Sequence, residues 1–451
     1  MTDQASDKPE AALSNKTMAF YGLPHFAHSI IILPMVLFIP SFYADDLALP
    51  LAKVGLMISI SRIVDVITDP IMGIVSDRWY SRWGRRKPWM VLALPLLILS
   101  TWMLFVPTGT VSAGYLLLWS MLLFTAFTVF DLPYKAWGAE LSTDYHERSR
   151  IAAWRQAFGA SGHITFLVIL LVMDMLGHDS NRGHLTVIAW MVCLSLPLFV
   201  MKAVLSVPER TPELLHGETF EGWASLKLTF HNHAFIRTVI ALILFGTGLM
   251  IQATLHKMVL KHVVGQAELF SALILAETVA SLLALPLWIK LSYWIGKHRA
   301  LTLAGLWIGL WSLALPGVGH GDGQLYFIII VARGCGLAAI IFLSNAIAAD
   351  VVDHDTLASG RQRTGFYFAL WGMAIKLAIG LGVFLGTALP AYFCFEPSMP
   401  MHAPAAELAL LRVYGWLPCL LMVSAFPLLW HFPIDREKQQ ATRAQIESRR
   451  K

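Results

Sequence analysis

The sequence predicts an all-α membrane protein of twelve transmembrane helices, arranged as two six-helix bundles. Two observations lead to this fold class. Hydrophobic residues make up 57% of the 451 residues and charged residues only 14%, whereas a soluble domain carries about 25% charged residues. The apolar residues form long continuous runs separated by polar loops. Helices are favoured over barrel strands because these runs do not alternate between apolar and polar residues.

About 20 apolar residues are needed to cross the hydrocarbon core of a bilayer, and the chain offers twelve such runs. In order, the predicted spans are 18–44, 52–77, 88–107, 112–136, 151–176, 184–206, 234–256, 267–290, 299–317, 325–350, 363–390 and 406–431. The predicted domains are a cytoplasmic N-terminal segment, an N-terminal bundle, a cytoplasmic linker, a C-terminal bundle and a cytoplasmic tail: 1–17, 18–206, 207–233, 234–431 and 432–451.

Basic residues set the predicted orientation, because Lys and Arg accumulate in cytoplasmic loops. The loop after the second span, "DRWYSRWGRRKP", carries five of them, and the loops after spans 4, 6, 8 and 10 also carry basic residues. The opposite loops "PTGTVSAG", "GVGHGDGQ" and "CFEPSMPMHAPAAE" carry none. Even-numbered spans are therefore expected to end in the cytoplasm, as are both chain ends.

A weak internal repeat relates the two predicted bundles. "YSRWGRRKPWMVLAL" resembles "LSYWIGKHRALTLAG", and "KAWGAELSTDYHERSR" resembles "NAIAADVVDHDTLASG", both at an offset of about 210 residues. Pseudo-symmetric halves of this kind are typical of the major facilitator fold, in which the substrate cavity lies between the halves near the bilayer midplane.

The second span contains two carboxylates, in "RIVDVITDPIMG". Asp65 and Asp69 are spaced i, i+4 and share one helix face. Ionisable groups within a span are costly, and two adjacent carboxylates repel each other unless a cation binds or a proton is shared. Hard cations such as Na⁺ prefer oxygen ligands, by analogy with Ca²⁺ and Mg²⁺. The alternative is structural: Arg62 pairs with one aspartate and locks neighbouring spans together.

Two further charges extend this candidate site. Asp131 lies near the end of the fourth span, with Thr128 one turn before it, so both are candidates for a Na⁺ site with Asp65 and Asp69. The alternative for Asp131 is a helix-end carboxylate in water. Lys376 lies about 13 residues into the eleventh span, too deep to reach the surface easily. We expect it to pair with a carboxylate of the N-terminal half and to act in substrate binding.

Other residues are candidates for substrate contacts. Arg155 could bind hydroxyl or carboxylate groups through its fork of donors, or it could be a cytoplasmic anchor. Glu277 lies near mid-depth in the eighth span and could contact substrate or join a packed polar cluster. His28 is a further candidate, although a single histidine is often a packing residue. Tyr134 and Trp371 flank these charges and offer aromatic faces.

A third group of charges is assigned to gating or structural ion pairs. The basic loop after the second span could hold one conformation closed through inter-helix pairs, or it could only determine topology. The residues in this group are Arg62, Asp77, Arg78, Arg85, Arg86, Asp350 and Arg361.

Three motifs, taken in order, resemble the glycoside–pentoside–hexuronide:cation symporter family, which includes melibiose permease. They are "RIVDVITDPIMGIVSDRWYSRWGRRKPW", "FDLPYKAW" and "ADVVDHDTLASGRQRTGFYFALWGMAIKLA", and the resemblance covers essentially the whole chain. It implies the major facilitator fold and the coupling of Na⁺, Li⁺ or H⁺ to sugar uptake. It also implies a cation site at Asp65, Asp69, Thr128 and Asp131, and it places the family's functional lysine and sugar-binding arginine at Lys376 and Arg155.

The chain departs from melibiose permease in the sugar site. Lys135 and Leu343 stand where sugar-stacking tryptophans are found, and Ser29 stands where a sugar-binding aspartate is found. The cation site therefore matches the family, while the galactoside site does not. A related animal branch moves lysophospholipids with Na⁺ on a similar scaffold.

The sequence thus predicts a secondary active transporter of the bacterial inner membrane that works by alternating access. Symport of a sugar, glycoside or uronate with Na⁺ or H⁺ is the main reading, and symport of an amphipathic solute such as a lysophospholipid is the alternative. The expected partners are the solute, the coupling cation and the bilayer, with no nucleic acid and no cofactor, and the monomer is expected to be functional. No HExxH, GxSxG, CxxC or phosphate-binding loop indicates an enzyme.

Overall fold

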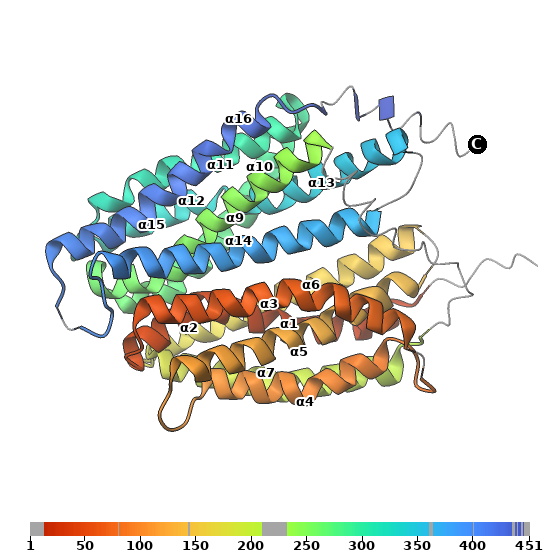
Figure 1. Cartoon of the computed structure of the whole chain (residues 1–451), viewed down its shortest axis with the longest axis horizontal. Coiled ribbons are helices and arrows are strands. Elements are labelled where there is room, and N and C mark those ends of the chain that lie inside the picture. The colour runs from red at the N-terminus through yellow and green to blue at the C-terminus, as the bar shows by residue number, and fades with distance from the viewer. Residues whose placement is uncertain are drawn as a thin grey trace, which may run out of the picture.

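A computed structural model describes residues 13–79, 81–142, 145–209, 232–359, 364–399 and 401–434, and positions 438, 439, 441, 442 and 445. These residues form helices joined by loops, and the β structure described is a single bridge between Ser81 and Gly84. In Figure 1 the helices up to residue 206 lie together below the helices that begin at residue 233. The two groups are called here the N-terminal and C-terminal halves.

The N-terminal half consists of six long helices. They are α1 (Asn15–Leu37), α3 (Leu51–Arg78), α4 (Lys87–Phe105), α5 (Ala113–Glu140), α6 (Tyr145–Met175) and α7 (Asn181–Ser206). Serine side chains cap three of them, as at Ser112, which accepts a hydrogen bond from the Tyr115 amide. The predicted first span, 18–44, is interrupted: α1 ends at Leu37, and a short α2 (Ile39–Ser41) and a π-helical turn, η1 (Phe42–Asp46), follow. Pro40 at the start of α2 explains the interruption, because proline cannot donate to the preceding turn.

The C-terminal half begins with α9 (His233–Val259), which also continues into a π-helical turn, η2 (Leu260–Val264). The elements that follow are η3 (Ala267–Leu269), α10 (Phe270–Ile295), α11 (Lys297–Leu313), η4 (Leu315–Gly317), α12 (Gly323–Gly334), α13 (Leu337–Ser359), α14 (Thr364–Tyr392), α15 (Pro404–Ser424) and α16 (Phe426–Leu429). Each half therefore ends its first long helix in a π-helical turn, a feature that often marks functional positions.

The predicted tenth span, 325–350, is two helices, because α12 and α13 are separated at Cys335 and Gly336. Glycine permits this break by allowing close packing: a Cβ atom on Gly336 would lie 2.7 Å from the Ile308 side chain. The carbonyl freed at Cys335 accepts a hydrogen bond from Trp288 Nε1 at 2.7 Å. Side chains of the same half thus pack against the break and satisfy its free carbonyl group.

The described residues contain eleven helical stretches that are long and apolar enough to cross a membrane. The helix α3 is missing from this group although its 28 residues extend about 42 Å. Every 18-residue window of α3 contains at least three charged residues, drawn from Lys53, Arg62, Asp65, Asp69, Asp77 and Arg78. Its exceptional charge, and not its length, sets α3 apart.

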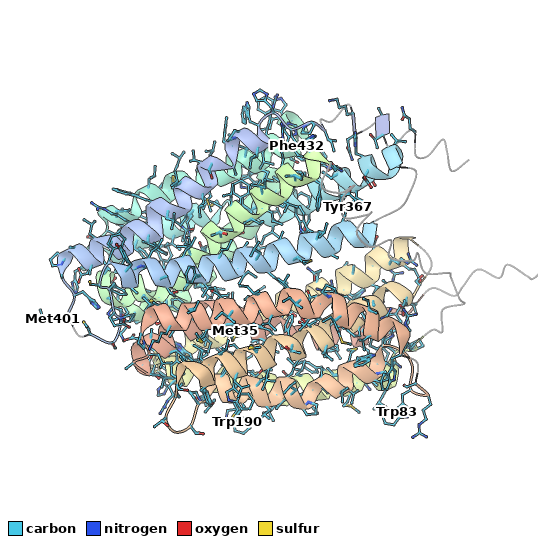
Figure 2. All side chains as sticks on the ribbon, viewed as in Figure 1. Met35, Trp83, Trp190, Tyr367, Met401 and Phe432 are labelled. Carbon is cyan, nitrogen blue, oxygen red and sulfur yellow. The ribbon has the colours of Figure 1, made fainter. Side chains whose placement is uncertain are left out.

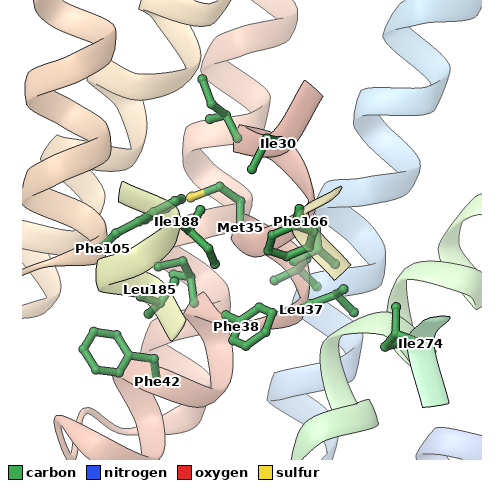
Figure 3. Packing of buried hydrophobic residues seen from close by; sticks show 14 of the residues in the cluster. Ile30, Met35, Leu37, Phe38, Phe42, Phe105, Phe166, Leu185, Ile188 and Ile274 are labelled. Atoms are coloured by element: carbon green, nitrogen blue, oxygen red, sulfur yellow. The ribbon is translucent and has the colours of Figure 1, made fainter. Parts of the chain in front are cut away.

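The two halves meet in two places. The large apolar cluster of the N-terminal half continues into the C-terminal half, and Figure 3 shows Phe38 and Phe166 on the side of this cluster that faces Ile274 of α10. A second cluster lies within the C-terminal half. The helices α3 and α14 also run antiparallel beside each other (Figure 1): Ser59 Oγ donates to the Gly380 carbonyl at 2.8 Å. This contact places α14 against the charged helix.

Equivalent ion pairs occur in the two halves. Arg86, at the start of α4, contacts Glu140 at the end of α5 at 2.7 Å, and Lys297, at the start of α11, contacts Asp350 of α13 at 2.6 Å. The partners are offset by 211 and 210 residues, which is the offset of the sequence repeat. Figure 2 shows Trp83, in the basic loop, and Met401 at opposite ends of the molecule.

Candidate functional site

The site begins with α3, which carries its two carboxylates on one face. Asp65 and Asp69 are one helical turn apart, and both point toward α5 and α14, as their partners show. Thr68 does not join them, because its hydroxyl donates to the Asp65 carbonyl of its own helix at 3.1 Å. The side chains that contact the two carboxylates therefore include residues of other helices.

Four side chains form an ion cluster: Asp65, Asp69, Thr128 and Lys376. Thr128 Oγ1 of α5 lies 2.7 Å from Asp65 Oδ1 and 2.8 Å from Asp69 Oδ1. Lys376 Nζ of α14 lies 2.9 Å from Asp65 Oδ2 and 2.6 Å from Asp69 Oδ2. Each carboxylate thus has one oxygen beside the threonine and the other beside the lysine. Three members come from the N-terminal half, whereas Lys376 comes from the C-terminal half.

In this arrangement the Thr128 hydroxyl has one hydrogen atom for two neighbouring acceptor oxygens. A hydroxyl has one hydrogen to donate, yet Thr128 Oγ1 lies within hydrogen-bond distance of two carboxylate oxygens. One of these contacts is satisfied by the hydroxyl hydrogen. The other contact brings two oxygen atoms together without a hydrogen atom from Thr128 between them.

Arg62 is the fixed counter-charge of the cluster. Its Nη1 atom lies 3.5 Å from Asp65 Oδ2, and its guanidinium stacks 3.5 Å from the Phe124 ring centroid on α5. The side chain is buried, and its Nε and Nη2 atoms have no hydrogen-bond partner among the described residues. Arg62 and Phe124 both belong to the N-terminal half, so this contact does not depend on the position of α14.

The two carboxylates differ in exposure. The Asp65 side chain is 3% exposed, whereas those of Asp69 and Lys376 are 19% and 21% exposed. Asp69 and Lys376 therefore face accessible space, and Asp65 lies behind them. An incoming cation would meet Asp69 first.

Asp131 does not contact the ion cluster, contrary to the expectation that it would share a Na⁺ site with Asp65 and Asp69. Its Oδ2 lies 2.5 Å from Lys135 Nζ, one turn further along α5, and its Oδ1 lies 4.0 Å from His28 Nδ1 of α1. Thr128 and Asp131 are about one turn apart on α5, but Thr128 contacts carboxylates of α3 while Asp131 lies near His28 of α1. Within the described residues, no group of three or more His, Cys, Asp or Glu side chains could hold a metal ion.

The substrate candidates of the N-terminal half surround Asp131. His28 is buried and stacks on Phe127 with ring centroids 3.9 Å apart, and neither of its ring nitrogens has a hydrogen-bond partner among the described residues. Tyr134 is buried too, and its hydroxyl donates to the Tyr21 carbonyl at 2.6 Å, so it ties α5 to α1. Arg155 of α6 lies within electrostatic range of Asp131. These residues form one polar region between α1, α5 and α6.

The candidates of the C-terminal half are placed differently. Glu277 of α10 forms a buried ion pair with Arg333, whose Nε atom donates to Glu277 Oε1 at 3.1 Å. Arg333 stands at the end of α12, beside the break before α13, and the sequence reasoning overlooked it. Trp371 is buried on α14, and its Nε1 has no hydrogen-bond partner among the described side chains. Glu277 is thus part of a packed ion pair in this conformation.

The charges of the basic loop and of the matching positions in the C-terminal half pair within their own halves. Arg85 Nη2 lies 3.7 Å from Glu140 Oε1, and the backbone amides of Arg85 and Arg86 donate to Glu209 at 2.5 and 2.6 Å. Asp350 accepts from Gln439 at 2.6 Å as well as from Lys297. The side chains of Asp77 and Arg78, and the whole of Arg361, lie outside the described residues. The pairs that are described link α4 to α5 and α11 to α13.

The two π-helical turns meet at the other end of the molecule, which sequence reasoning did not anticipate. Asp45 of η1 forms a salt bridge with Lys261 of η2, and His262 Nε2 lies 3.5 Å from the same carboxylate oxygen. We call Asp45, Lys261 and His262 the outer charge group. It borders a pocket of about 500 Å³ that His320 and His402 also line. Although burial opposes it, hydrogen bonding to His262 and Lys261 holds the pKa of Asp45 below its usual value.

Lys257 lies one turn before the outer charge group and adds a second contact between the halves. It is 3% exposed, its Nζ has no hydrogen-bond partner among the described residues, and it lies 4.5 Å from the Phe38 ring and 4.9 Å from the Phe270 ring. Phe38 belongs to the N-terminal half and Phe270 to α10. The lysine is therefore stabilised by aromatic faces on both sides of the interface.

The chain matches a family of known proteins over most of its length. Residues 20–436 match the family model described as MFS/sugar transport protein. The chain is 24% identical to the inner membrane symporter YicJ of Escherichia coli, across 90% of this chain and 89% of that protein. It is 22% identical to an Escherichia coli glucuronide carrier protein homolog, across 97% of each chain. It is also 22% identical to the sodium-dependent lysophosphatidylcholine symporter 1 of Xenopus tropicalis, across 91% and 85%.

Solved structures share the fold at low identity. The nucleoside transporter NupG superimposes with a TM-score of 0.68 at 14% identity, across 94% of this chain and all of that one. A D-xylose–proton symporter superimposes with a TM-score of 0.65 at 15% identity, across 93% and 97%. These likenesses extend over both halves and concern the arrangement of the helices.

Proposed function

Since the chain belongs to the MFS/sugar transport protein family, we propose that its ion cluster couples a cation, Na⁺ or H⁺, to the uptake of a solute by alternating access. The chain is a polytopic plasma-membrane transporter and not an enzyme, as the family and its symporter relatives indicate. The roles of individual residues are the content of the proposal.

The position of Lys376 carries the proposal. This lysine belongs to the C-terminal half, and its Nζ atom lies 2.9 Å from Asp65 Oδ2 and 2.6 Å from Asp69 Oδ2 of the N-terminal half. A cation that binds these carboxylates competes with the ammonium group for the same oxygens. Cation binding therefore releases a contact between the halves, which is the link that coupling requires.

The cation site consists of the carboxylates of Asp65 and Asp69 and the hydroxyl of Thr128. Arg62 compensates one of the two negative charges permanently, and Lys376 compensates the other when no cation is bound. Asp131 belongs to the solute side of the pathway, because the side chains that it contacts or approaches are Lys135 and His28. The same oxygens suit Na⁺ or a proton, so the geometry leaves both coupling ions open.

The conformation described is closed at the end where η1 and η2 meet. The outer charge group and Lys257 join the halves there, and we assign this end to the extracellular side because the basic loop with Arg85 and Arg86 lies at the other end. These contacts must break when the site opens outward. The outer charge group then acts as the extracellular gate of the alternating-access cycle.

The topology follows from the same assignment. With α3 as a membrane span, the eleven apolar stretches become twelve, six in each half. Residues 18–206 and 234–431 form the two bundles, 207–233 the cytoplasmic linker, and the segments 1–17 and 432–451 the cytoplasmic ends. The bundles enclose one pathway, so the monomer is the expected transport unit.

A sugar, glycoside or uronate is the solute class that the relatives favour, because a glucuronide carrier homolog aligns over 97% of the chain. The second class is a lysophospholipid, since a lysophosphatidylcholine symporter aligns over 91% of it. Lys135 replaces an aromatic sugar-stacking position by a charge, which favours the second class.

Membrane vesicles test the proposal. Right-side-out vesicles that contain the full chain are given a Na⁺ gradient or a pH gradient separately, with panels of sugars, glycosides, uronates and lysophospholipids. We expect one gradient to drive accumulation of at least one solute above its external concentration, and Asp69→Asn to abolish it. Accumulation by the Asp69→Asn protein at the level of the unmodified protein would contradict the role of the ion cluster.

A further inference from the structure

The polar region between α1, α5 and α6 has more positive than negative charge. It contains the carboxylate of Asp131 and the cations of Lys135 and Arg155. Lys135 Nζ contacts Asp131 Oδ2 at 2.5 Å. Arg155 forms no ion pair or hydrogen bond in the part of the chain that the structure describes, and its Nη1 atom is buried without a partner. One guanidinium therefore lacks a counter-charge.

Histidines do not supply the missing negative charge. His25 of α1 lies within electrostatic range of Arg155, Asp131, Lys135 and His163, and its Nδ1 has no hydrogen-bond partner among the described residues. His163 Nε2 contacts the Ser29 carbonyl at 2.8 Å. The His163 N–H is therefore already donated to Ser29, and neither ring carries a negative charge. The histidines thus do not balance the charge of Arg155.

The ion cluster does not balance this charge either. Arg62 and Lys376 already match Asp65 and Asp69, two charges against two. A coupling cation adds one further positive charge to the interior. Burying an uncompensated charge is unfavourable, so the loaded protein requires an anionic partner more than the empty one does.

We propose that the transported solute is an anion, and that its carboxylate or phosphate group binds between Arg155 of α6 and Lys135 of α5. This inference rests on the proposed function and names the solute class of its site. The guanidinium fork suits the paired oxygens of either anionic group. Lys135, whose side chain is 51% exposed, turns from Asp131 to the solute when the anion arrives.

The alternative is that Arg155 and Lys135 only anchor the cytoplasmic ends of their helices. An anchoring side chain extends its charged group to water. Arg155 instead has a buried Nη1 atom and lies within electrostatic range of the buried Tyr21, His28 and Tyr134. The Arg155 side chain is thus partly buried, which matches a ligand-binding group better than an anchor.

Two matched pairs of probes test the inference, because each pair differs only in the anionic group. The first pair is p-nitrophenyl β-D-glucuronide and p-nitrophenyl β-D-glucoside, and the second is oleoyl-lysophosphatidic acid and mono-oleoylglycerol. Binding to the purified full chain in NaCl is followed by tryptophan fluorescence. In at least one pair we expect the anionic member to bind about tenfold tighter or more, as a charge-assisted contact provides.

Variants connect this preference to the two residues. Arg155→Gln and Lys135→Gln are expected to reduce the preference to near unity, while Arg155→Lys keeps part of it because the charge remains. Arg182→Gln, an exposed arginine of the same half, is the control that leaves the preference unchanged. Thermal unfolding of each variant separates loss of binding from loss of fold, and Arg155→Lys provides a reading even where Arg155→Gln does not fold.

The outcomes separate this inference from the proposed function. Equal or tighter binding of the neutral members, or binding of no member of either pair, overturns the inference. Accumulation of a neutral solute by an ion gradient would leave the proposed function standing and refute the anionic solute. If an anion binds but neither ion gradient drives its accumulation, the anion-binding site stands and the proposed function is refuted.

Discussion

Lys376 Nζ of α14 lies 2.6 Å from Asp69 Oδ2 of α3, and the two residues belong to opposite halves of the molecule. The contact lies away from the ends of both helices, and the side chains of Lys376 and Asp69 are 21% and 19% exposed. A charge pair in this place costs desolvation on both sides and is stabilising only while it is closed. We propose that a mobile cation replaces the lysine, keeps the aspartates compensated and releases this contact between α14 and α3.

The first prediction concerns Asp69. Asp69→Asn removes one of the two charges that attract the cation, and we expect gradient-driven accumulation to be abolished. Solute binding should persist, because Asp69 is not placed at Arg155 or Lys135. Uptake into vesicles measures the first effect and fluorescence binding the second. Asp322→Asn, in the loop before α12, is the control with normal accumulation.

The second prediction concerns Lys376. Lys376→Met removes the competitor for Asp65 and Asp69, so the coupling cation should bind about tenfold tighter or more. The empty protein should then reorient slowly, because the two carboxylates keep only Arg62 as a counter-charge. Titration with the coupling cation measures the affinity, and comparison of exchange with net efflux measures reorientation. Unchanged cation affinity would contradict the competition.

The third prediction concerns the extracellular gate. Asp45→Lys places like charges opposite Lys261 and should favour the outward-open state, and the exchange Asp45→Lys with Lys261→Asp should restore closure. Spin labels at Lys53 and Glu268, on a background without the four native cysteines, report the separation of the halves. A distance that does not widen in Asp45→Lys would show that the outer charge group does not hold the gate.

The gate should also have a defined response to external pH. Because the pKa of Asp45 is below its usual value, its contribution to closure is complete above the ordinary value and is lost only as pH falls through the lowered one. Acidification from about pH 7 to about pH 5 should therefore leave the contact with Lys261 intact. The same spin-label distance measured across this range checks the expectation. Widening above pH 5 would contradict this role of Asp45.

The fourth prediction concerns the buried pair in the C-terminal half. Glu277→Gln leaves Arg333 buried without a counter-charge, and we expect a loss of about 3–5 kcal/mol in stability. The double variant Glu277→Met with Arg333→Met should recover most of it. Thermal unfolding with a fluorescent thiol-independent dye measures both. Full stability of Glu277→Gln, together with lost solute binding, would instead make Glu277 a substrate contact.

The fifth prediction concerns the approach of α3 to α14. A Cβ atom on Gly55 would lie 1.6 Å from Thr387 Oγ1, so Gly55→Ala must push the helices apart and should lower the unfolding temperature and transport together. Gly73→Ala on the same helix meets nothing within 4 Å and is the matched control. Because alanine favours helices over glycine, the control should be as stable as the unmodified protein or slightly more so.

The sequence could predict much of this site because ionisable residues are rare in apolar spans. Asp65, Asp69 and Lys376 stood out for that reason, and the i, i+4 spacing placed both aspartates on one face. Arg333, in "IIIVARGCG", carries the same signal and was overlooked. The partners of a charge are harder to predict, since they depend on helix rotation: Thr128 contacts carboxylates of α3, while Asp131, about one turn later, lies near His28 of α1.

The π-helical turns and the break between α12 and α13 could not be predicted, because they leave no recognisable pattern in the sequence. The π-helical turns at Phe42–Asp46 and Leu260–Val264 break no hydrophobic run, so their charges looked like ordinary loop residues. Their contact depends on how the two halves approach each other, which is a long-range property. The break between α12 and α13 was signalled only by Gly334 and Gly336, and glycine is common in membrane helices.

The charge of the ion cluster has an electrical consequence. Asp65, Asp69, Arg62 and Lys376 sum to zero, so the empty cluster reorients without moving net charge through the membrane potential, which would otherwise contribute about 2.3 kcal/mol per charge per 100 mV. A bound cation adds one charge, and a monoanionic solute removes it again. Uptake of a monoanion would then be insensitive to voltage, whereas uptake of a neutral solute would carry a current. The voltage dependence of transport therefore reports what the protein carries.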